Sequence, residues 1–171
     1  ARCHVAADAR RWAAPAERLI AELNALPGRA GWFPEPCCER ARFLRPENGA
    51  RVDAIRDRIA SLALEPALEA IALTSLIEAA DRVDSTTGVQ MAYLKQWAPR
   101  ALKALELRVP EMLPGEGSAS ELDARAAAER FEADLAYLDP PYNQHSYLGN
   151  YHVWESLVRW DKPDVYGVAM K

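Results

Sequence analysis

Hydrophobic residues recur at helical spacing in three stretches of the first half of the chain. Their apolar positions are Leu19, Ile20, Leu23 and Leu26 in the first stretch, Val52, Ile55 and Ile59 in the second, and Leu68, Ile71, Leu76 and Ala79 in the third. This spacing predicts helices over about 15–26, 48–62 and 66–83. Alanine, leucine, glutamate and arginine, which favour helix, are frequent in all three. We therefore expect most of the first half to be helical.

Two short stretches in the second half carry patterns typical of strands. Leu105, Leu107 and Val109 alternate with charged residues, and an apolar run at 135–138 follows an alanine-rich helix predicted over about 120–131. A helix followed by a buried strand is an α/β unit. We expect an α/β fold with part of a sheet and a large, mostly helical insertion.

Composition excludes several classes of protein. Half of the 171 residues are hydrophobic, which is enough to bury a core. Charged residues interrupt every apolar run before the about 20 residues that a membrane span needs, and residues 1–30 carry too many charges for a secretory signal. Cys3, Cys37 and Cys38 are odd in number and lack metal-ligand spacing, so neither a disulfide framework nor a zinc site is indicated. The pattern fits a cytoplasmic protein with no membrane association.

Charge is distributed unevenly along the chain. The net charge is −4, but residues 1–60 sum to +3 and residues 61–171 to −7. Arginines are dense between 40 and 58, and such a density can meet the phosphates of a nucleic acid. Acidic residues alternate with these arginines, so a solvated helix face held by salt bridges explains the same pattern. Charge alone leaves both interpretations open.

The most informative motif is Asp139-Pro140-Pro141-Tyr142, directly after the run at 135–138. Open α/β sheets bind ligands at the carboxyl ends of their strands, although a plain turn has a similar composition. The Asp139 carboxylate and the Pro140 carbonyl can each accept one N–H of a nucleobase amine, which frees the amine lone pair for an electrophile. The prolines fix that geometry, and Tyr142 offers a flat face on which an extruded base can stack.

This motif resembles the catalytic motif of the adenine-N6 DNA methyltransferases. The similarity is to the D12 class, which includes the methylase partners of type IIS restriction enzymes. It continues through residues 143–147, Asn150-Tyr151-His152, Glu155 and 160–163, and upstream through 84–88, 93–95 and the helix from Arg51 to Arg58. The resemblance therefore covers most of the chain.

The resemblance implies a partial Rossmann-like methyltransferase fold that transfers the methyl group of S-adenosylmethionine to adenine N6 in double-stranded DNA. Residues 1–105 would be a mostly helical target-recognition region, and residues 106–171 would be part of the catalytic domain. Asp139 and Pro140 would hold the amine, with Asp139 also next to the cofactor, Pro141 would stiffen the turn, and Tyr142 would stack on the flipped adenine. The implied DNA contacts are Thr86, Thr87, Gly88, Lys95, Tyr142 and Tyr147. A cognate restriction endonuclease is an expected partner.

The sequence departs from the D12 pattern at the cofactor site. The family has an N-terminal strand and a Phe/Gly-rich loop that cradles the methionine part of the cofactor, and this sequence starts after them, at Ala1-Arg2-Cys3-His4. Gly115-Glu116-Gly117 follows a proline and is typical of a surface turn. We therefore expect an internal piece of a methyltransferase, with Leu135 and Leu138 exposed. Two alternatives are a non-catalytic helical DNA-binding remnant and a methyltransferase acting on an RNA base or a protein amide.

Other candidate chemistry has an ordinary structural explanation. His152 and Glu155 are spaced like metal ligands on a predicted helix, but no third ligand lies near them, so no metal is expected. Tyr147, Tyr151 and Trp154 fall at helical spacing, which is more typical of a core position than of a stacking group. Tyr147 alone could line a base pocket.

Overall fold

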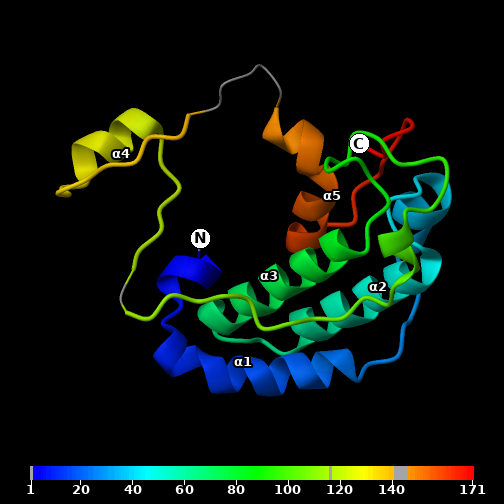
Figure 1. The fold of residues 1–171 in the computed structure, drawn as a ribbon, viewed down its shortest axis with the longest axis horizontal. Helices are drawn as coiled ribbons and strands as arrows, with labels where there is room; N and C mark the ends of the chain where they lie inside the picture. The colour runs from blue at the N-terminus through cyan, green and yellow to red at the C-terminus, as the bar shows by residue number, and fades with distance from the viewer. Residues whose placement is uncertain (1, 116, 141–145) are drawn as a thin grey trace.

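The computed structural model describes residues 2–115, 117–140 and 146–171. Its helical elements are η1 (Arg2–Ala6), α1 (Ala9–Asn24), η2 (Glu35–Arg40), α2 (Pro46–Ser61), α3 (Pro66–Arg82), η3 (Pro99–Leu102), α4 (Ala124–Arg130) and α5 (Tyr147–Arg159). α1, α2 and α3 form the body of the molecule, α5 packs against α3, and α4 stands apart (Figure 1). None of the helices in these ranges is long and apolar enough to cross a bilayer.

The three predicted helices of the first half are confirmed, with one change at the start of α1. The Asp8 carboxylate accepts a hydrogen bond from the backbone N–H of Arg10 at 3.0 Å and caps a helix that begins well before Pro15. Trp12 and Ala16 extend its buried face toward the N-terminus. Pro15 therefore lies inside the helix, where its ring removes one backbone hydrogen bond.

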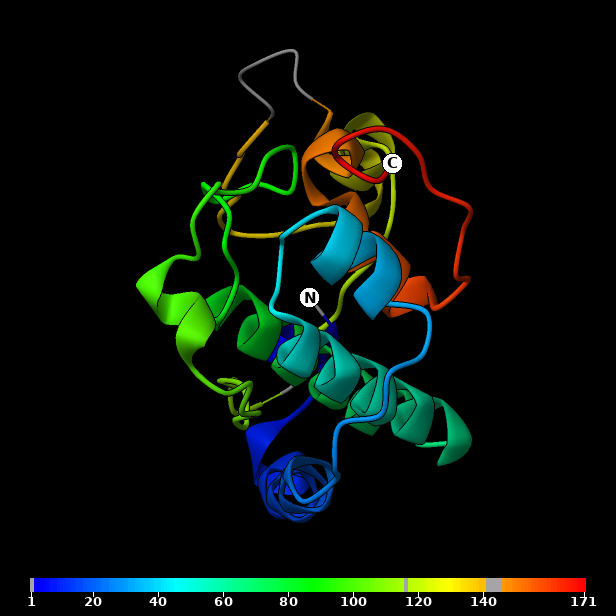
Figure 2. The ribbon, with the colours of Figure 1, turned by 90° about the vertical axis from the view of Figure 1, so that its right-hand side faces the viewer.

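The core lies between α1, α2 and α3. Figure 2 looks along α1 and shows α2 in front of α3, with both helices crossing above α1. The buried side chains from these helices include Leu19, Ile20, Leu23, Val52, Ile55, Ile59, Ala72, Leu76 and Ala79. Each large apolar side chain among them contributes roughly 1.5–3 kcal/mol through its burial. η2 closes one end of the core, where Phe33 and Phe43 are at most 1% exposed.

The expected sheet is absent from the described residues, so the α/β, partial Rossmann-like assignment is wrong for this part of the chain. Its helices are joined by irregular segments, and the β-pairing found there is one isolated antiparallel bridge between Thr86 and Tyr93. The run at 135–138 has no partner strand, and a strand is stable only when neighbours pair with its backbone. Leu135 and Leu138 are 87% and 84% exposed, as expected from the missing sheet.

The alternating stretch that contains Leu105 and Leu107 is not a strand either, although both side chains are only 2% exposed. Its backbone pairs with two asparagine side chains. Asn48 donates to the carbonyl of Lys103 and accepts from the N–H of Leu105, both at 2.9 Å. Asn24 donates to the carbonyl and accepts from the N–H of Leu107, again at 2.9 Å. These two amides take the place of a neighbouring strand.

Candidate functional site

The predicted catalytic motif lies at the edge of a described range. Asp139 and Pro140 are described and exposed, and Pro141 and Tyr142 lie outside the described residues. Every residue from 128 to 140 is exposed, so the described residues around Asp139 do not enclose a pocket for a cofactor of nucleoside size. What the structure does show is an Asp139 carboxylate accessible to a ligand.

α5 begins shortly after the motif and presents two aromatic rings to solvent. Ser146 caps the helix, since its Oγ accepts from the N–H of Gly149 at 3.4 Å. Tyr147 and Tyr151 stack with ring centroids 6.4 Å apart and an interplanar angle of 21°, and they are 62% and 38% exposed. The core position that their spacing suggested is wrong for these two, whereas Trp154 packs against the core. The stacked rings offer a flat surface to a planar ligand.

Three of the expected DNA contacts after α3, Thr86, Thr87 and Gly88, lie on a loop that one antiparallel bridge between Thr86 and Tyr93 closes, and Lys95 follows two residues beyond it. Thr86 is buried; its hydroxyl donates to the Asp84 carboxylate and accepts from the N–H of Gly88 at 3.1 Å. Gly88 has φ +99°, a conformation that side chains other than glycine rarely adopt. Thr87, Gly88 and Lys95 are exposed. Thr86 therefore shapes the loop, and the other three residues face solvent.

Two contacts fix this loop. Arg100 donates through Nε to Oδ1 of Asp84 at 2.8 Å and through Nη2 to the carbonyl of Thr86 at 2.9 Å, and the Asp84 side chain is only 2% exposed. The backbone N–H of Gln90 donates to the carbonyl of Asn150 in α5 at 2.8 Å. The structure thus brings the loop beside the first turns of α5, where the stacked rings lie.

α2 holds the other end of α5. Arg56 donates to the backbone carbonyls of Leu157 and Val158, each at 2.9 Å. Trp160, just beyond the helix, donates from its indole Nε1 to Oδ1 of Asp57 at 2.8 Å. α5, the helix that follows the motif, is therefore joined to the loop after α3 at its first turns and to α2 at its last turn.

The other titratable side chains that the sequence singled out, His152, Glu155, Cys37 and Cys38, show no sign of a catalytic or metal-binding role within the described residues. His152 is half-buried, its Nε2 lies 2.6 Å from the carbonyl of Ala169, and burial lowers the pKa of its imidazole. Glu155 is exposed, and no cluster of three histidine, cysteine or acidic side chains within the described ranges could hold a metal ion. Burial raises the pKa of the Cys37 and Cys38 thiols, which keeps both protonated and unreactive.

Comparison with known proteins decides the family. Residues 21–171 match the family model described as D12 class N6 adenine-specific DNA methyltransferase. The chain belongs to this family. The resemblance drawn from its motifs is thereby confirmed.

Three curated methylases share this part of the D12 family. The chain is 38% identical over 136 residues to Type II methyltransferase M.FokI of Planomicrobium okeanokoites, a match that covers 76% of the chain and 21% of that protein. It is 34% identical over 135 residues to Modification methylase StsI of Streptococcus sanguinis, covering 75% and 21%. It is 31% identical over 156 residues to Type II methyltransferase M.NlaIII of Neisseria lactamica, covering 85% and 47%.

The chain thus spans about a fifth of the length of the first two methylases and about half of the third. No solved structure matches this chain.

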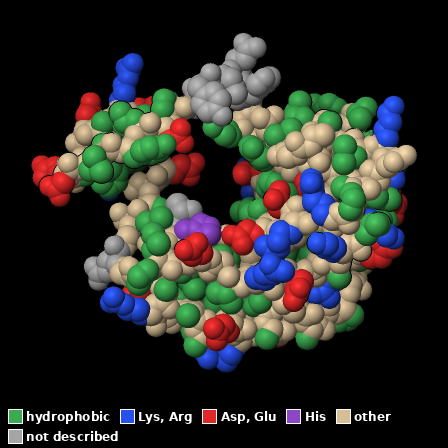
Figure 3. All heavy atoms as spheres, viewed as in Figure 1, with side chains coloured by type: hydrophobic (Ala, Val, Ile, Leu, Met, Phe, Trp, Pro, Cys, Tyr) green, Lys and Arg blue, Asp and Glu red, His purple; other side chains and the backbone are tan. Residues whose placement is uncertain are grey.

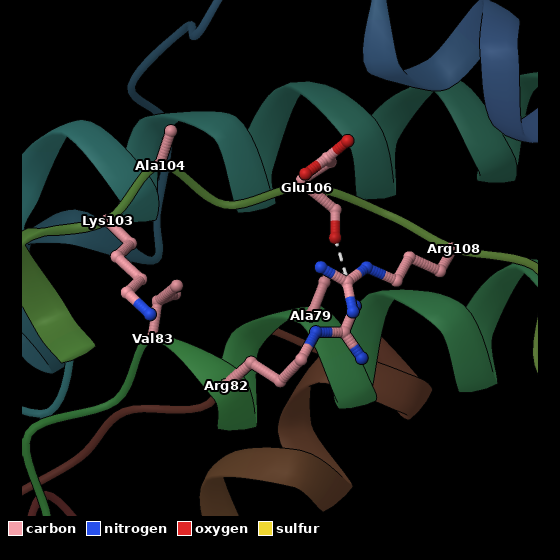
Figure 4. A pocket seen from close by; sticks show the side chains of 7 residues that line it. All are labelled: Ala79, Arg82, Val83, Lys103, Ala104, Glu106 and Arg108. Carbon is pink, nitrogen blue, oxygen red and sulfur yellow. Dashed lines mark hydrogen bonds between the residues drawn. The ribbon is translucent and has the colours of Figure 1, made fainter.

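This D12 chain also has a cleft of about 510 Å³ that sequence reasoning missed. It is lined by Ala79, Arg82, Val83, Lys103, Ala104, Glu106 and Arg108 (Figure 4). Arg82, at the end of α3, donates from Nη2 to the carbonyl of Glu106 at 3.0 Å, which ties the helix to the segment beyond η3. Arg82 lies more than twenty residues before Lys103 and Arg108, so no local motif could reveal that the three cations share one hollow.

Proposed function

We propose that the protein carrying this chain transfers a methyl group from S-adenosylmethionine to adenine N6 at a specific site in double-stranded DNA. The observation that supports it most strongly is the D12 family match, which spans the Asp139-Pro140-Pro141-Tyr142 motif. S-adenosylmethionine supplies the electrophilic methyl group. Asp139 would lie next to it, and we assign the rest of the cofactor pocket to none of the described residues, because those around Asp139 do not enclose it.

The part of Asp139 and Pro140 in this reaction is to hold the amine. The carboxylate of Asp139 and the carbonyl of Pro140 would each accept one N–H of the adenine, so that the nitrogen lone pair points away from both. Pro141 would keep the turn rigid, and Tyr142 would stack on the flipped base. Asp139 is exposed, which leaves its carboxylate available for this contact.

We propose that residues 1–105 read the DNA target and that residues 106–171 contribute the motif to the catalytic domain. Thr87, Gly88 and Lys95 would contact DNA from the exposed loop beside α5, and Tyr147 from its exposed ring. Thr86, which is buried, would support them by holding the loop in shape. We also propose a cognate restriction endonuclease as a partner of the protein, and a cytoplasmic location. Two of the curated relatives are named modification methylases, which supports this proposal.

The test is methyl transfer to duplex DNA by the full-length gene product, with Asp139→Ala compared to Asp134→Ala. Both acids are exposed in the same irregular segment, so neither change removes a packed side chain. We expect the Asp139 variant to lose about 10²-fold or more in kcat, a loss typical of removing one well-placed polar group from an active site. The Asp134 variant should behave like the wild type.

The alternatives give different results in the same assay. Full activity of the Asp139 variant would contradict the role of the motif. Duplex binding by the wild type without any methyl transfer would instead favour a non-catalytic DNA-binding remnant. Label transferred to RNA or to protein only would favour the other acceptor classes.

A further inference from the structure

We propose that the cleft between α3 and the segment after η3 is a binding site for phosphate groups of the DNA backbone, held by Arg82, Lys103 and Arg108. This inference rests on the proposed function, because it takes duplex DNA as the partner. It adds a contact surface to the loop and motif residues that the D12 resemblance implied.

The cationic side chains converge on the hollow. Figure 4 shows Arg82 reaching in from α3 and Arg108 from the facing segment, so that their side chains point toward one another, while Lys103 enters from the other end beside Val83. The carboxylate of Glu106, the single acid of the lining, points to the opposite side of its segment. The space inside is therefore bordered by positive charge.

Little within the described residues neutralises these cations. Arg82 lies 3.8 Å from Glu78, but both side chains are more than a third exposed, and such pairs are worth little in water. Lys103 and Arg108 form no ion pair within the described ranges. Two neighbouring guanidinium groups repel each other, and an anion between them would replace repulsion with charge-assisted hydrogen bonds.

The spread of the cations favours a ligand with more than one anionic group. A guanidinium pair at one end of the cleft and an ammonium at the other suit successive phosphates of a nucleic-acid strand, whose duplex carries one charge per about 1.7 Å of its axis. Arginine also binds phosphate with two parallel hydrogen bonds.

The position of the cleft agrees with that ligand. Val83, which lines it, is followed directly by Asp84, where the loop with Thr87 and Gly88 begins. Figure 3 shows Lys and Arg side chains gathered on the face over α3 and the adjoining segment. This concentration occurs although residues 61–171 sum to −7, so it does not follow from the average charge. A strand lying in the cleft would continue toward the loop.

The test measures how duplex affinity depends on salt in the full-length gene product. Fluorescence anisotropy with a labelled duplex oligonucleotide would compare the wild type with Lys103→Gln/Arg108→Gln. Arg10→Gln/Arg18→Gln is the matched control, because it removes the same charge from exposed positions on α1. We expect the slope of log affinity against log salt to become shallower by about 2 in the cleft variant, about 1 for each lost phosphate contact.

Further readouts separate the outcomes. Equal slopes in the cleft variant and the wild type, an equal loss in the control variant, or a wild type that binds no duplex would overturn the cleft assignment. Inorganic phosphate that competes better than chloride at equal ionic strength would show a site for free phosphate instead of the backbone. Methyl transfer at saturating DNA is measured in parallel, with kcat expected unchanged and KM raised in the cleft variant. If the wild type transfers no methyl group but its slope of log affinity against log salt is still steeper than that of the cleft variant, the proposed function is refuted and the cleft assignment stands.

Discussion

Arg56 of α2 donates a hydrogen bond from Nε to the backbone carbonyl of Leu157 in α5 at 2.9 Å, across 101 residues of sequence. The last carbonyls of a helix have no partner within the helix, and a planar guanidinium can satisfy two of them at once. Arg56 does so by also reaching Val158, and its guanidinium carbon lies 5.5 Å from the centre of the Trp160 ring. The helix that follows the motif at 139–142 is therefore positioned by α2.

Arg56→Met should lower the free energy of unfolding by about 3 kcal/mol, because it removes two hydrogen bonds from a charged donor and leaves two carbonyls unpaired. Urea denaturation followed by circular dichroism measures this. Arg58→Met is the control, since Arg58 makes an exposed pair with Glu22 that should contribute within about 1 kcal/mol. Equal effects of the two substitutions would show that Arg56 does not hold α5.

Asn48→Ala should cost about 1–3 kcal/mol, because the N–H of Leu105 and the carbonyl of Lys103 would lose their partner. Hydrogen exchange gives a local readout: the Leu105 amide should lose protection more than amides of the α3 core do. Gln96→Ala, at an exposed position, should leave exchange unchanged. An Asn48 variant with a fully protected Leu105 amide would refute the idea that asparagine replaces a strand here.

Gly49→Ala should destabilise the protein although alanine favours helix more than glycine does. A Cβ at Gly49 would clash with Sγ of Cys38, and overpacking of this kind costs about 1–3 kcal/mol. In the Cys38→Ala background the same substitution should be tolerated, because the sulfur atom is gone. Thermal denaturation of the four proteins in this cycle measures the coupling, and additive effects would contradict the steric explanation.

Stability should depend on pH through His152. Burial lowers the pKa of this imidazole from its usual value near 6.5, so between the two values the unfolded chain binds a proton that the folded chain does not. The free energy of unfolding should therefore fall as the pH drops below about 6.5, with a slope of at most about 1.4 kcal/mol per pH unit from this group. Urea titrations at about pH 7.5 and about pH 5.5 test this.

His152→Gln should reduce that difference between the two pH values, because glutamine does not titrate. His4→Gln, at a side chain that is 45% exposed, serves as the comparison. If the His152 variant keeps the full pH dependence, another group is responsible for it.

Periodicity predicted α2 and α3 to within two residues, because the apolar positions of a helix report directly which face is buried. The alternation at Leu105 and Leu107 also reported burial correctly. It could not reveal that the backbone pairs with Asn24 and Asn48 instead of a strand, because side-chain partners distant in sequence leave no local pattern.

The motif at 139–142 could be recognised because it is contiguous in the sequence, and the family match spans it. The catalytic role of its residues stays a prediction. Sequence spacing could not distinguish Trp154, which packs inward, from Tyr147 and Tyr151, which stack outside. The cleft of Arg82, Lys103 and Arg108 exists only once the segment after η3 packs on α3, because Arg82 lies more than twenty residues before the other two cations in the sequence.

The central claim is methylation of adenine N6, and identifying the product nucleoside tests it most directly. The full-length gene product would be incubated with duplex DNA and S-adenosylmethionine carrying an isotopically labelled methyl group, and the digested DNA would be analysed by mass spectrometry. We expect the label in N6-methyl-2′-deoxyadenosine, and its loss with Asp139→Ala but not with Asp134→Ala. Label in a methylated cytosine, or none in DNA from a protein that binds both duplex and cofactor, would contradict the claim.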